Sequence, residues 1–361
     1  MRVLIAPDKF AGTLTAVEAA RAMADGWARH APQDVLDLAA MADGGPGFVD
    51  VLHEALGGEL SAVTVTGPHR DPVPGAVLVL GDSAWVESAQ ACGLTLTRGD
   101  GAEAATTWGV GELVLQAVEA GATDVVVGLG GSGTNDGGAG LLGALGATAD
   151  RPLDQGATGL DGITELDLEP ARAALRRVRL TVASDVDSPL TGLFGATKQF
   201  GPQKGIAEDR LPWVDGLLEQ LAAATDRRTA LAKGAGAAGG LGFALLLLGA
   251  SRRPGFDVVS EAVDLRGRAR SADLVLTGEG SFDFSSRSGK VPYGVAAVAA
   301  EAVRPCVALA GRVLVGAREM RALGIEAAYS LVDLVGEEQA MRDPAASLTR
   351  LAERVARTWS H

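Results

Sequence analysis

The sequence predicts an α/β protein, in which a doubly wound parallel-sheet (Rossmann-like) domain carries a second, mixed α/β domain inserted into it. At both ends of the chain, short apolar runs alternate with amphipathic helix patterns. Residues 60–86 instead contain apolar runs separated by turns, a pattern typical of antiparallel strands. A chain of 361 residues is long enough for two cores. We therefore expect residues 1–60 and 251–361 to form the Rossmann-like domain and residues 61–250 the inserted domain.

The first elements follow from local patterns. Residues 3–6 are an apolar run that predicts a strand, and the pattern over residues 16–30 predicts a helix. Thr15 and Glu18 have the spacing of a capping box, which places the start of this helix. A strand at 35–38 and a helix at 49–56 complete a βαβα alternation, which indicates a parallel sheet.

The inserted region and the C-terminal part are read in the same way. Antiparallel strands are expected at 61–65, 76–80 and 84–86, and alternation then resumes with a helix at 109–120, a strand at 124–128, a helix at 139–146 and a strand at 180–183. Three further strands are expected at 274–276, 306–309 and 328–331, separated by helices.

Composition and charge exclude several classes of function. The net charge of −13 argues against general nucleic-acid binding, which depends on basic surface. The most apolar segment, residues 237–250, is too short to cross a membrane and predicts a buried helix. The chain enters a strand directly, without the pattern of a signal peptide. Two cysteines without a partner spacing favour a reducing compartment, so we expect a soluble, cytoplasmic protein with no membrane or nucleic-acid partner.

The glycine-rich loop at residues 128–140 (GLGGSGTNDGGAG) lies between a predicted strand and a predicted helix. Glycines allow backbone N–H groups to turn toward an anion, and the helix N-terminus adds partial positive charge. Gly131, Ser132, Thr134 and Asn135 are therefore candidate ligand-binding residues. Asp136 has two interpretations: it holds Mg²⁺, or it caps the helix.

A second candidate region follows the strand at 274–276. Glu279, Asp283 and Lys290 lie in loops at the carboxyl end of this strand, where open α/β sheets bind their ligands. The segment does not match a P-loop, because Lys290 is followed by Val291. Residues 234–239 (GAGAAG) match the dinucleotide fingerprint as a string, but the preceding residues predict a helix. A nicotinamide-dependent dehydrogenase is an alternative that requires a strand there.

Three aspartates, Asp8, Asp43 and Asp185, each follow an apolar run directly. Phosphoryl transfer needs carboxylates that hold Mg²⁺ and orient the attacking hydroxyl. Each aspartate alone is equally well explained as a turn cap, but three at equivalent positions favour a shared site. The chain also has only five lysines among its 32 basic residues, and these lie in or beside the glycine-rich loops: Lys9, Lys198, Lys204, Lys233 and Lys290. This placement suggests that lysine is kept where a compact cation meets an oxyanion.

Taken together, these motifs resemble the type I glycerate kinases. The matching stretches cover nearly the whole chain in the family's order: 6–16 (APDKFAGTLTA), 42–47 (ADGGPG), 106–113 (TTWGVGEL), 128–146, 182–189 (VASDVDSP), 200–205 (FGPQKG), 234–242 and 277–296. The resemblance implies a two-domain α/β enzyme that phosphorylates D-glycerate with ATP and Mg²⁺. It leaves open which hydroxyl is phosphorylated, and it is compatible with a homodimer.

The sequence departs from the family pattern at several positions. Ala11 replaces a common lysine, Pro46 replaces a glutamate, and Phe48 stands where a small hydroxylated residue is common. Ser188 replaces an asparagine and Ser285 a glutamine. These changes leave two alternatives: a kinase for a related small hydroxy acid, and a catalytically silent regulator that binds a sugar acid.

The expected site combines the residue analysis with this resemblance. Catalytic roles are expected for Asp185, Lys290 and Asp283, and Mg²⁺ ligation for Asp136 and Asp185. Substrate and nucleotide binding is expected from Asp8, Lys9, Asp43, Gly44, Gly131, Ser132, Thr134, Asn135, Lys204 and Glu279. The glycerate carboxylate is expected to pair with Lys204 or Lys290, and one aspartate orients the attacking hydroxyl.

Overall fold

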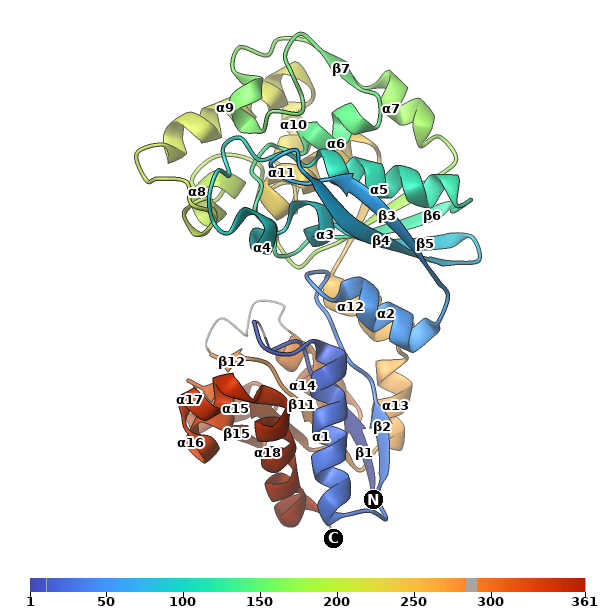
Figure 1. The fold of residues 1–361 in the computed structure, drawn as a ribbon, viewed down its shortest axis with the longest axis vertical. Helices are drawn as coiled ribbons and strands as arrows, with labels where there is room; N and C mark the ends of the chain where they lie inside the picture. Colours follow the sequence, from blue (N-terminus) through green and yellow to red (C-terminus); the bar gives the residue numbers. More distant parts are fainter. Residues whose placement is uncertain (11, 284–290, 361) are drawn as a thin grey trace. The chain divides into compact units, whose positions relative to one another are not determined.

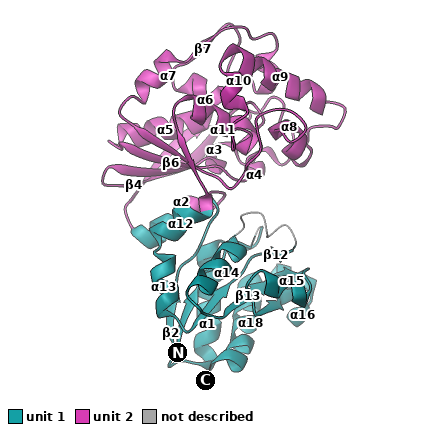
Figure 2. Cartoon of the chain, turned by 180° about the vertical axis from the view of Figure 1, so that it is seen from behind, with its two compact units in different colours: residues 1–43, 50–56, 256–361 teal, residues 44–49, 57–255 magenta. Residues whose placement is uncertain are grey.

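The computed structural model describes residues 1–10, 12–283 and 291–360. The chain divides into two compact units, which Figure 2 shows in different colours. Unit 1 comprises residues 1–43, 50–56 and 256–361, and unit 2 comprises residues 44–49 and 57–255. Residues 44–49, which the sequence groups with the first domain, thus make most of their contacts with unit 2. Ala11 and Ser285, two of the departures from the family pattern, lie outside the described residues.

Unit 1 is built on a five-stranded parallel sheet with the order β15-β13-β11-β1-β2. The strands are β1 (Arg2–Ile5), β2 (Val35–Leu38), β11 (Leu274–Thr277), β13 (Cys306–Ala310) and β15 (Ala327–Ser330). β1 pairs with β2 on one side and with β11, some 270 residues later in the chain, on the other. This is a doubly wound order in which the direction of winding reverses between β1 and β11. The predicted fold class is therefore confirmed.

Helices cover both faces of this sheet (Figure 1). α1 (Ala16–His30) and α18 (Pro344–Trp359) pack against Val3, Ile5 and their neighbours on the same face. α13 (Leu265–Ser271) and α14 (Val291–Glu301) contact the sheet through other residues. The expected capping box begins α1, since the Thr15 side chain accepts from Glu18 N and Glu18 reaches back to Thr15 N. The remaining elements of unit 1 are α15 (Ala317–Ala322), α16 (Leu331–Val335), α17 (Glu337–Arg342), β12 (Ser281–Phe282) and β14 (Arg312–Val313).

Two helices cross the limits of the units. α2 (Phe48–Leu56) begins in residues assigned to unit 2 and continues in unit 1. α12 (Gly255–Ala262) begins at the last residue of unit 2. The chain crosses the limits of the units after residues 43, 49, 56 and 255, and the crossings after residues 49 and 255 lie near the start of a helix.

Unit 2 contains a six-stranded mixed sheet with the order β10-β9-β6-β5-β4-β3. Its strands are β3 (Glu59–Thr66), β4 (Pro72–Leu80), β5 (Ser83–Glu87), β6 (Asp124–Gly128), β9 (Arg179–Ala183) and β10 (Ser251–Arg253). β3, β4 and β5 pair antiparallel, as the turn-separated runs predict, and β5, β6, β9 and β10 pair parallel.

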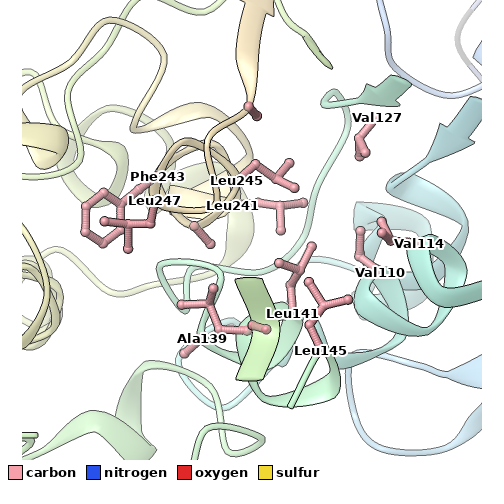
Figure 3. Packing of buried hydrophobic residues seen from close by; sticks show 14 of the residues in the cluster. Val110, Val114, Val127, Ala139, Leu141, Leu145, Leu241, Phe243, Leu245 and Leu247 are labelled. Atoms are coloured by element: carbon pink, nitrogen blue, oxygen red, sulfur yellow. The ribbon is translucent and has the colours of Figure 1, made fainter. Parts of the chain in front are cut away.

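The core of unit 2 lies between this sheet and three helices. α5 (Trp108–Glu119), α6 (Ala139–Ala144) and α11 (Ala237–Leu247) contribute the apolar side chains that Figure 3 shows in contact with one another. The residues expected to form a buried helix at 237–250 are thus part of this core. The other elements of the unit are α3 (Ala89–Cys92), α4 (Leu94–Thr97), β7 (Thr148–Ala149), β8 (Leu166–Asp167), α7 (Glu169–Ala174), α8 (Ala196–Phe200), α9 (Leu211–Ala224), α10 (Arg227–Ala230), and 3-10 turns at Ala157–Leu160 and Pro202–Lys204.

The glycines at 234–239 serve close packing. They are preceded by helices α9 and α10, as predicted, and not by the strand that a dinucleotide-binding motif needs. Gly239 has a φ of +69°, and a Cβ atom built on it would lie 2.0 Å from the Thr134 carbonyl oxygen. The backbone of α11 therefore packs directly against the loop at 128–140, and the dehydrogenase alternative loses its only motif.

None of the helices within the described residues is both long enough and apolar enough to span a membrane.

Candidate active site

A cavity of about 430 Å³ lies at the carboxyl ends of the strands in unit 1. Each strand of the sheet contributes to its lining through the residues that follow it: Asp8 after β1, Asp43 after β2, Glu279 after β11, Gly311 after β13 and Leu331 after β15. The cavity includes the loops after β1 and β11, where the winding of the sheet reverses. Open α/β sheets bind their ligands at this position, because the loops on either side of the reversal diverge and leave a crevice.

One end of the cavity is polar and contains four of the predicted site residues. Asp8 and Glu279 are 7% and 6% exposed, and Lys9 and Asp43 are partly exposed. Lys9 Nζ lies 3.5 Å from Asp8 Oδ1 and 3.5 Å from Asp43 Oδ1. The loop is fixed by a backbone hydrogen bond from Asp8 N to Gly278 O (2.8 Å), and Lys9 N donates to Asp8 Oδ1 (2.8 Å). Residues from three strand ends are thus brought together.

Several carboxyl groups lie close together at this polar end. Burial raises the pKa of Asp8 to about 7, because its effect is larger than the lowering by Lys9, and the carboxylates of Asp43 and Glu279 add to the rise. Burial by itself lowers the pKa of Lys9, but Asp43 and Asp8 outweigh it, so that the pKa of Lys9 is raised overall. Among the described residues, the Lys9 ammonium group lies beside the carboxylates of Asp8 and Asp43, and Glu279 places further negative charge near Asp8, an arrangement that attracts a proton or a metal cation.

Oxygen ligands of this kind suit Mg²⁺, which usually binds one or two protein carboxylates together with phosphate oxygens. Within the described residues, no group of three or more His, Cys, Asp or Glu side chains is arranged as a complete metal site. The donor set at the polar end therefore fits an ion that arrives with a phosphate substrate better than a permanently bound one.

Asp283 lies close to this cavity, whereas Lys290 cannot be placed. Ser281, which lines the cavity, donates a hydrogen bond to Asp283 Oδ2 at 3.4 Å. Lys290, predicted from the same segment, lies outside the described residues.

The remaining predicted residues belong to unit 2, mostly in the loop at 128–140. Lys204 is 2% exposed, and its Nζ donates to Ser132 Oγ (2.9 Å) and to the Thr134 carbonyl oxygen (2.7 Å). Burial lowers the pKa of Lys204 to about 8, against the opposing influence of Cys92 and Asp136. Asn135 is fully buried and donates to Thr197 Oγ1 (2.9 Å). These hydrogen bonds tie residues 132–135 of the glycine-rich loop to Lys204 and Thr197, and the Gly131 carbonyl oxygen accepts from Leu94 N (2.8 Å).

For Asp136, the structure favours the capping interpretation over metal binding. Asp136 is fully buried, and its Oδ2 accepts from Thr107 N (2.8 Å), Thr107 Oγ1 (2.8 Å) and Gly140 N (3.2 Å). Its Oδ1 accepts from Gly138 N (2.9 Å), just before α6 begins. Burial raises the pKa of Asp136, while these hydrogen bonds oppose the rise. Because both carboxylate oxygens are bonded to the chain, we assign Asp136 a structural role and withdraw it as an Mg²⁺ ligand.

Asp185 and Gly44 surround the carboxyl end of β9. Asp185 follows the strand, and its Oδ1 accepts from Gly255 N at 3.2 Å. Gly44 has a φ of +90°, and a Cβ atom built on it would lie 2.6 Å from the Ala183 carbonyl oxygen. Gly44 is therefore required by close approach of two backbone segments, whatever ligand this region binds.

Replacing Gly44 by alanine is expected to destabilise the protein by about 2–4 kcal/mol, because the methyl group must displace the end of β9 in addition to straining φ. Gly47 is the matched control: it has a φ of +91° but nothing within 4 Å of a built Cβ atom. Gly47→Ala should therefore cost only the strain, about 1 kcal/mol. Urea unfolding of both variants measures the difference, and equal losses would contradict the close-approach explanation.

Sequence reasoning missed several residues that line the cavity in unit 1. Arg312, from β14, forms an ion pair with Glu337, the first residue of α17. Leu331, Val332, Ala340 and Met341 form an apolar wall. Arg312 lies just after a buried apolar strand, as Asp8 does. Searching for charged residues of both signs after apolar runs, and not for aspartates alone, would therefore have found it. The wall comes from helices, and its apolar residues could not be distinguished by sequence from core residues.

Comparisons with known proteins give consistent results. The model of the Glycerate kinase family matches residues 3–360. A glycerate kinase from Bacillus subtilis is 39% identical, with 99% of this chain and 97% of the relative aligned. A glycerate 2-kinase from Escherichia coli is 35% identical, over 99% of this chain and 98% of the relative. A crystal structure described as glycerate kinase 2 from Salmonella typhimurium LT2 superposes with a TM-score of 0.82 at 35% identity, covering 99% and 98% of the two chains.

Proposed function

This chain belongs to the glycerate kinase family, and on that premise we propose that it transfers the γ-phosphoryl group of ATP to a hydroxyl group of D-glycerate. The observation that carries this proposal for the site itself is the cluster of Asp8, Lys9, Asp43 and Glu279 in the cavity at the strand ends of unit 1. Phosphoryl transfer requires positioning and charge neutralisation more than covalent chemistry, and this cluster offers both signs of charge.

Asp8 is suited to receive the proton of the attacking hydroxyl. A general base is most effective when its pKa lies near the working pH, and the pKa of Asp8 is raised to about 7. Its position is also well defined, because its backbone N–H is bonded to Gly278 and one carboxylate oxygen to Lys9 N. We therefore assign to Asp8 the role of orienting the hydroxyl and accepting its proton.

Lys9 has a different role. Its ammonium group is held between Asp8 and Asp43, and its raised pKa keeps it charged at neutral pH. In this position it stabilises the negative charge that spreads over the transferred phosphoryl oxygens.

Asp43 and Glu279 would hold Mg²⁺, which is an oxygen-binding cation that neutralises phosphate charge when bound. Asp43 belongs to the loop after β2, whereas Glu279 directly follows Gly278, whose carbonyl oxygen accepts from Asp8 N.

Asp283, Asp185 and Lys290 stay proposed catalytic residues on the strength of the family motifs that contain them. The same holds for Ser132, Thr134, Asn135 and Lys204 as residues that support binding through the loop at 128–140. We also propose that the protein acts in the cytoplasm, which is supported by the two buried free thiols, Cys92 and Cys306.

The test of the proposed function is ADP release by the purified protein with Mg·ATP and D-glycerate, beside a panel of related hydroxy acids. We expect turnover with D-glycerate to exceed turnover with every other acid. ³¹P NMR of the product then distinguishes 2-phosphoglycerate from 3-phosphoglycerate. Activity with another acid but not with D-glycerate would mean that the acceptor site has been retuned. Binding without ADP release from any acid would identify a silent binding protein.

A further inference from the structure

The cavity in unit 1 has two chemically different ends. The polar end contains Asp8, Lys9, Asp43 and Glu279. The other end is lined by Leu331, Val332, Ala340, Met341 and Pro344, which come from α16, α17 and the first turn of α18. The ion pair of Arg312 with Glu337, the first residue of α17, also lines the cavity, and its two charges offset each other. One continuous cavity therefore joins a charged region to an apolar one.

The apolar wall is held in place by its own hydrogen bonds. Val332 N donates to the Gly311 carbonyl oxygen (3.1 Å), which ties α16 to the loop after β13. Ser330 Oγ donates to the same oxygen (3.3 Å) and accepts from Asp333 N (3.2 Å), so that it also caps α16. Asp343 accepts from Ala346 N (3.3 Å) and begins α18 at Pro344. The wall is thus preformed rather than assembled by a ligand.

The size and chemistry of this cavity exceed what D-glycerate needs. D-Glycerate is a three-carbon acid that is polar throughout, and an apolar wall provides no partners for its hydroxyl and carboxylate groups. A cavity of about 430 Å³ lies in the range that holds ligands of drug size. A nucleotide matches both ends, because it combines a flat, largely apolar base with a charged polyphosphate.

We propose that the apolar end of this cavity binds the adenine base of the phosphoryl donor, against Met341, Val332 and Pro344, with the phosphates directed toward Lys9. This inference rests on the proposed function, since it assumes a nucleotide donor. Met341 is 62% exposed and so is an apolar side chain that solvent reaches at the rim of the cavity. Covering it with a base removes apolar surface from water, which is favourable.

The test measures binding of ADP to the intact chain by isothermal titration calorimetry, with and without Mg²⁺, and binding of tripolyphosphate as a ligand that lacks the base. Two variants place a carboxylate in the wall. Met341→Glu changes an exposed side chain, and Pro344→Glu changes the first position of α18, where an acidic residue suits the helix dipole. Val303→Glu is the control, because Val303 belongs to the same unit, is 85% exposed and does not line the cavity.

We expect Met341→Glu and Pro344→Glu each to raise the Kd for ADP by about tenfold. Both variants should leave the Kd for tripolyphosphate and the KM for D-glycerate unchanged. Val303→Glu should change none of these three constants. Unchanged ADP binding in both wall variants would overturn the inference, even if glycerate-dependent ADP release persists. An equal loss of ADP and tripolyphosphate binding would also overturn it, since repulsion of the phosphates would then explain the effect. A raised KM for D-glycerate alone would assign this end to the acceptor.

The two proposals fail in distinguishable ways. If the wild-type protein binds ADP and the wall variants weaken this binding, the inference stands even where no hydroxy acid gives turnover. If D-glycerate is phosphorylated but the wall variants bind ADP normally, the kinase proposal stands and the base lies elsewhere.

Discussion

Replacing Asp8 by asparagine is expected to lower kcat with D-glycerate by about 10³-fold. Removal of a positioned general base typically costs 10²–10⁴-fold in rate, and asparagine keeps the shape of the side chain while it cannot accept the proton. The hydrogen bond from Lys9 N to Oδ1 can be retained, so the loop after β1 should keep its conformation. Steady-state assays of ADP release measure the effect. A loss of less than tenfold would remove Asp8 from the role of base.

The same variant is expected to be more stable than the wild-type protein above neutral pH. The folded-state pKa of Asp8 is about 7 and the unfolded value is 3.8, so the folded protein holds a proton between these values that the unfolded chain releases. Stability therefore falls as pH rises from about 4 to about 7, and the charged carboxylate destabilises the fold at every higher pH. Asp8→Asn lacks this penalty, and we expect it to be about 2–4 kcal/mol more stable at pH 8 and nearly unchanged at pH 4.

Urea unfolding at several pH values, with EDTA to remove metal ions, measures this difference. Asp37→Asn is the control: Asp37 belongs to β2 of the same unit and pairs with Arg268 at the surface, away from the cavity. It should alter neither kcat nor the pH profile appreciably. If Asp8→Asn gains stability while it loses activity, Asp8 is kept for function and not for folding. Parallel losses of stability and activity in Asp8→Asn would instead indicate a structural role.

Replacing Lys204 is expected to change how stability depends on pH. Its folded pKa is lowered to about 8 from an unfolded value of 10.5, so that between these values the unfolded chain holds a proton that the folded protein has released. The free energy of unfolding therefore rises as pH increases from about 8 to 10.5, where the folded protein keeps Lys204 neutral. This contribution is lost as pH falls through 8, because the buried side chain must then carry a charge. We expect the stability of the wild-type protein relative to Lys204→Met to increase by about 2–3 kcal/mol between pH 7.5 and pH 10.

The companion variant Lys204→Ala tests how tightly the chain packs around the Lys204 side chain. Both variants lose the two hydrogen bonds to Ser132 and Thr134, but only Lys204→Ala also leaves a cavity, so we expect it to be about 2–4 kcal/mol less stable than Lys204→Met at pH 9. Chemical unfolding of both variants between pH 7 and pH 10 supplies the data. If the difference in free energy of unfolding between the wild-type protein and Lys204→Met does not change with pH, Lys204 is not buried in the folded protein.

The two lysines illustrate what a sequence pattern leaves undecided. Lys9 and Lys204 both lie in or beside glycine-rich loops and were both expected to meet ligands. Lys9 lines a cavity with two carboxylates at 3.5 Å, whereas Lys204 is 2% exposed and bonded to its own loop. Exposure and the direction of a side chain depend on which segments pack around it, and this information is not local to the loop.

The sequence by itself determined the secondary structure, the fold class and the family. Alternation of apolar runs and helix patterns predicted β1, α1, β2 and the antiparallel β3–β5 correctly, because hydrophobic periodicity and capping are properties of neighbouring residues. It also rejected residues 234–239 as a dinucleotide motif, since the helix pattern before them is local as well.

Only the tertiary structure decided which candidate residues share a site. Asp8 and Glu279 are about 270 positions apart in the chain, and the pairing of β1 with β11 brings their loops together. Tertiary packing also forms the apolar wall that contains Met341, and it brings Asp136 to the Thr107 backbone that it caps. The physical reason is that a side chain's burial and its partners are set by packing between segments distant in sequence, and the energies of those contacts are absent from any local pattern.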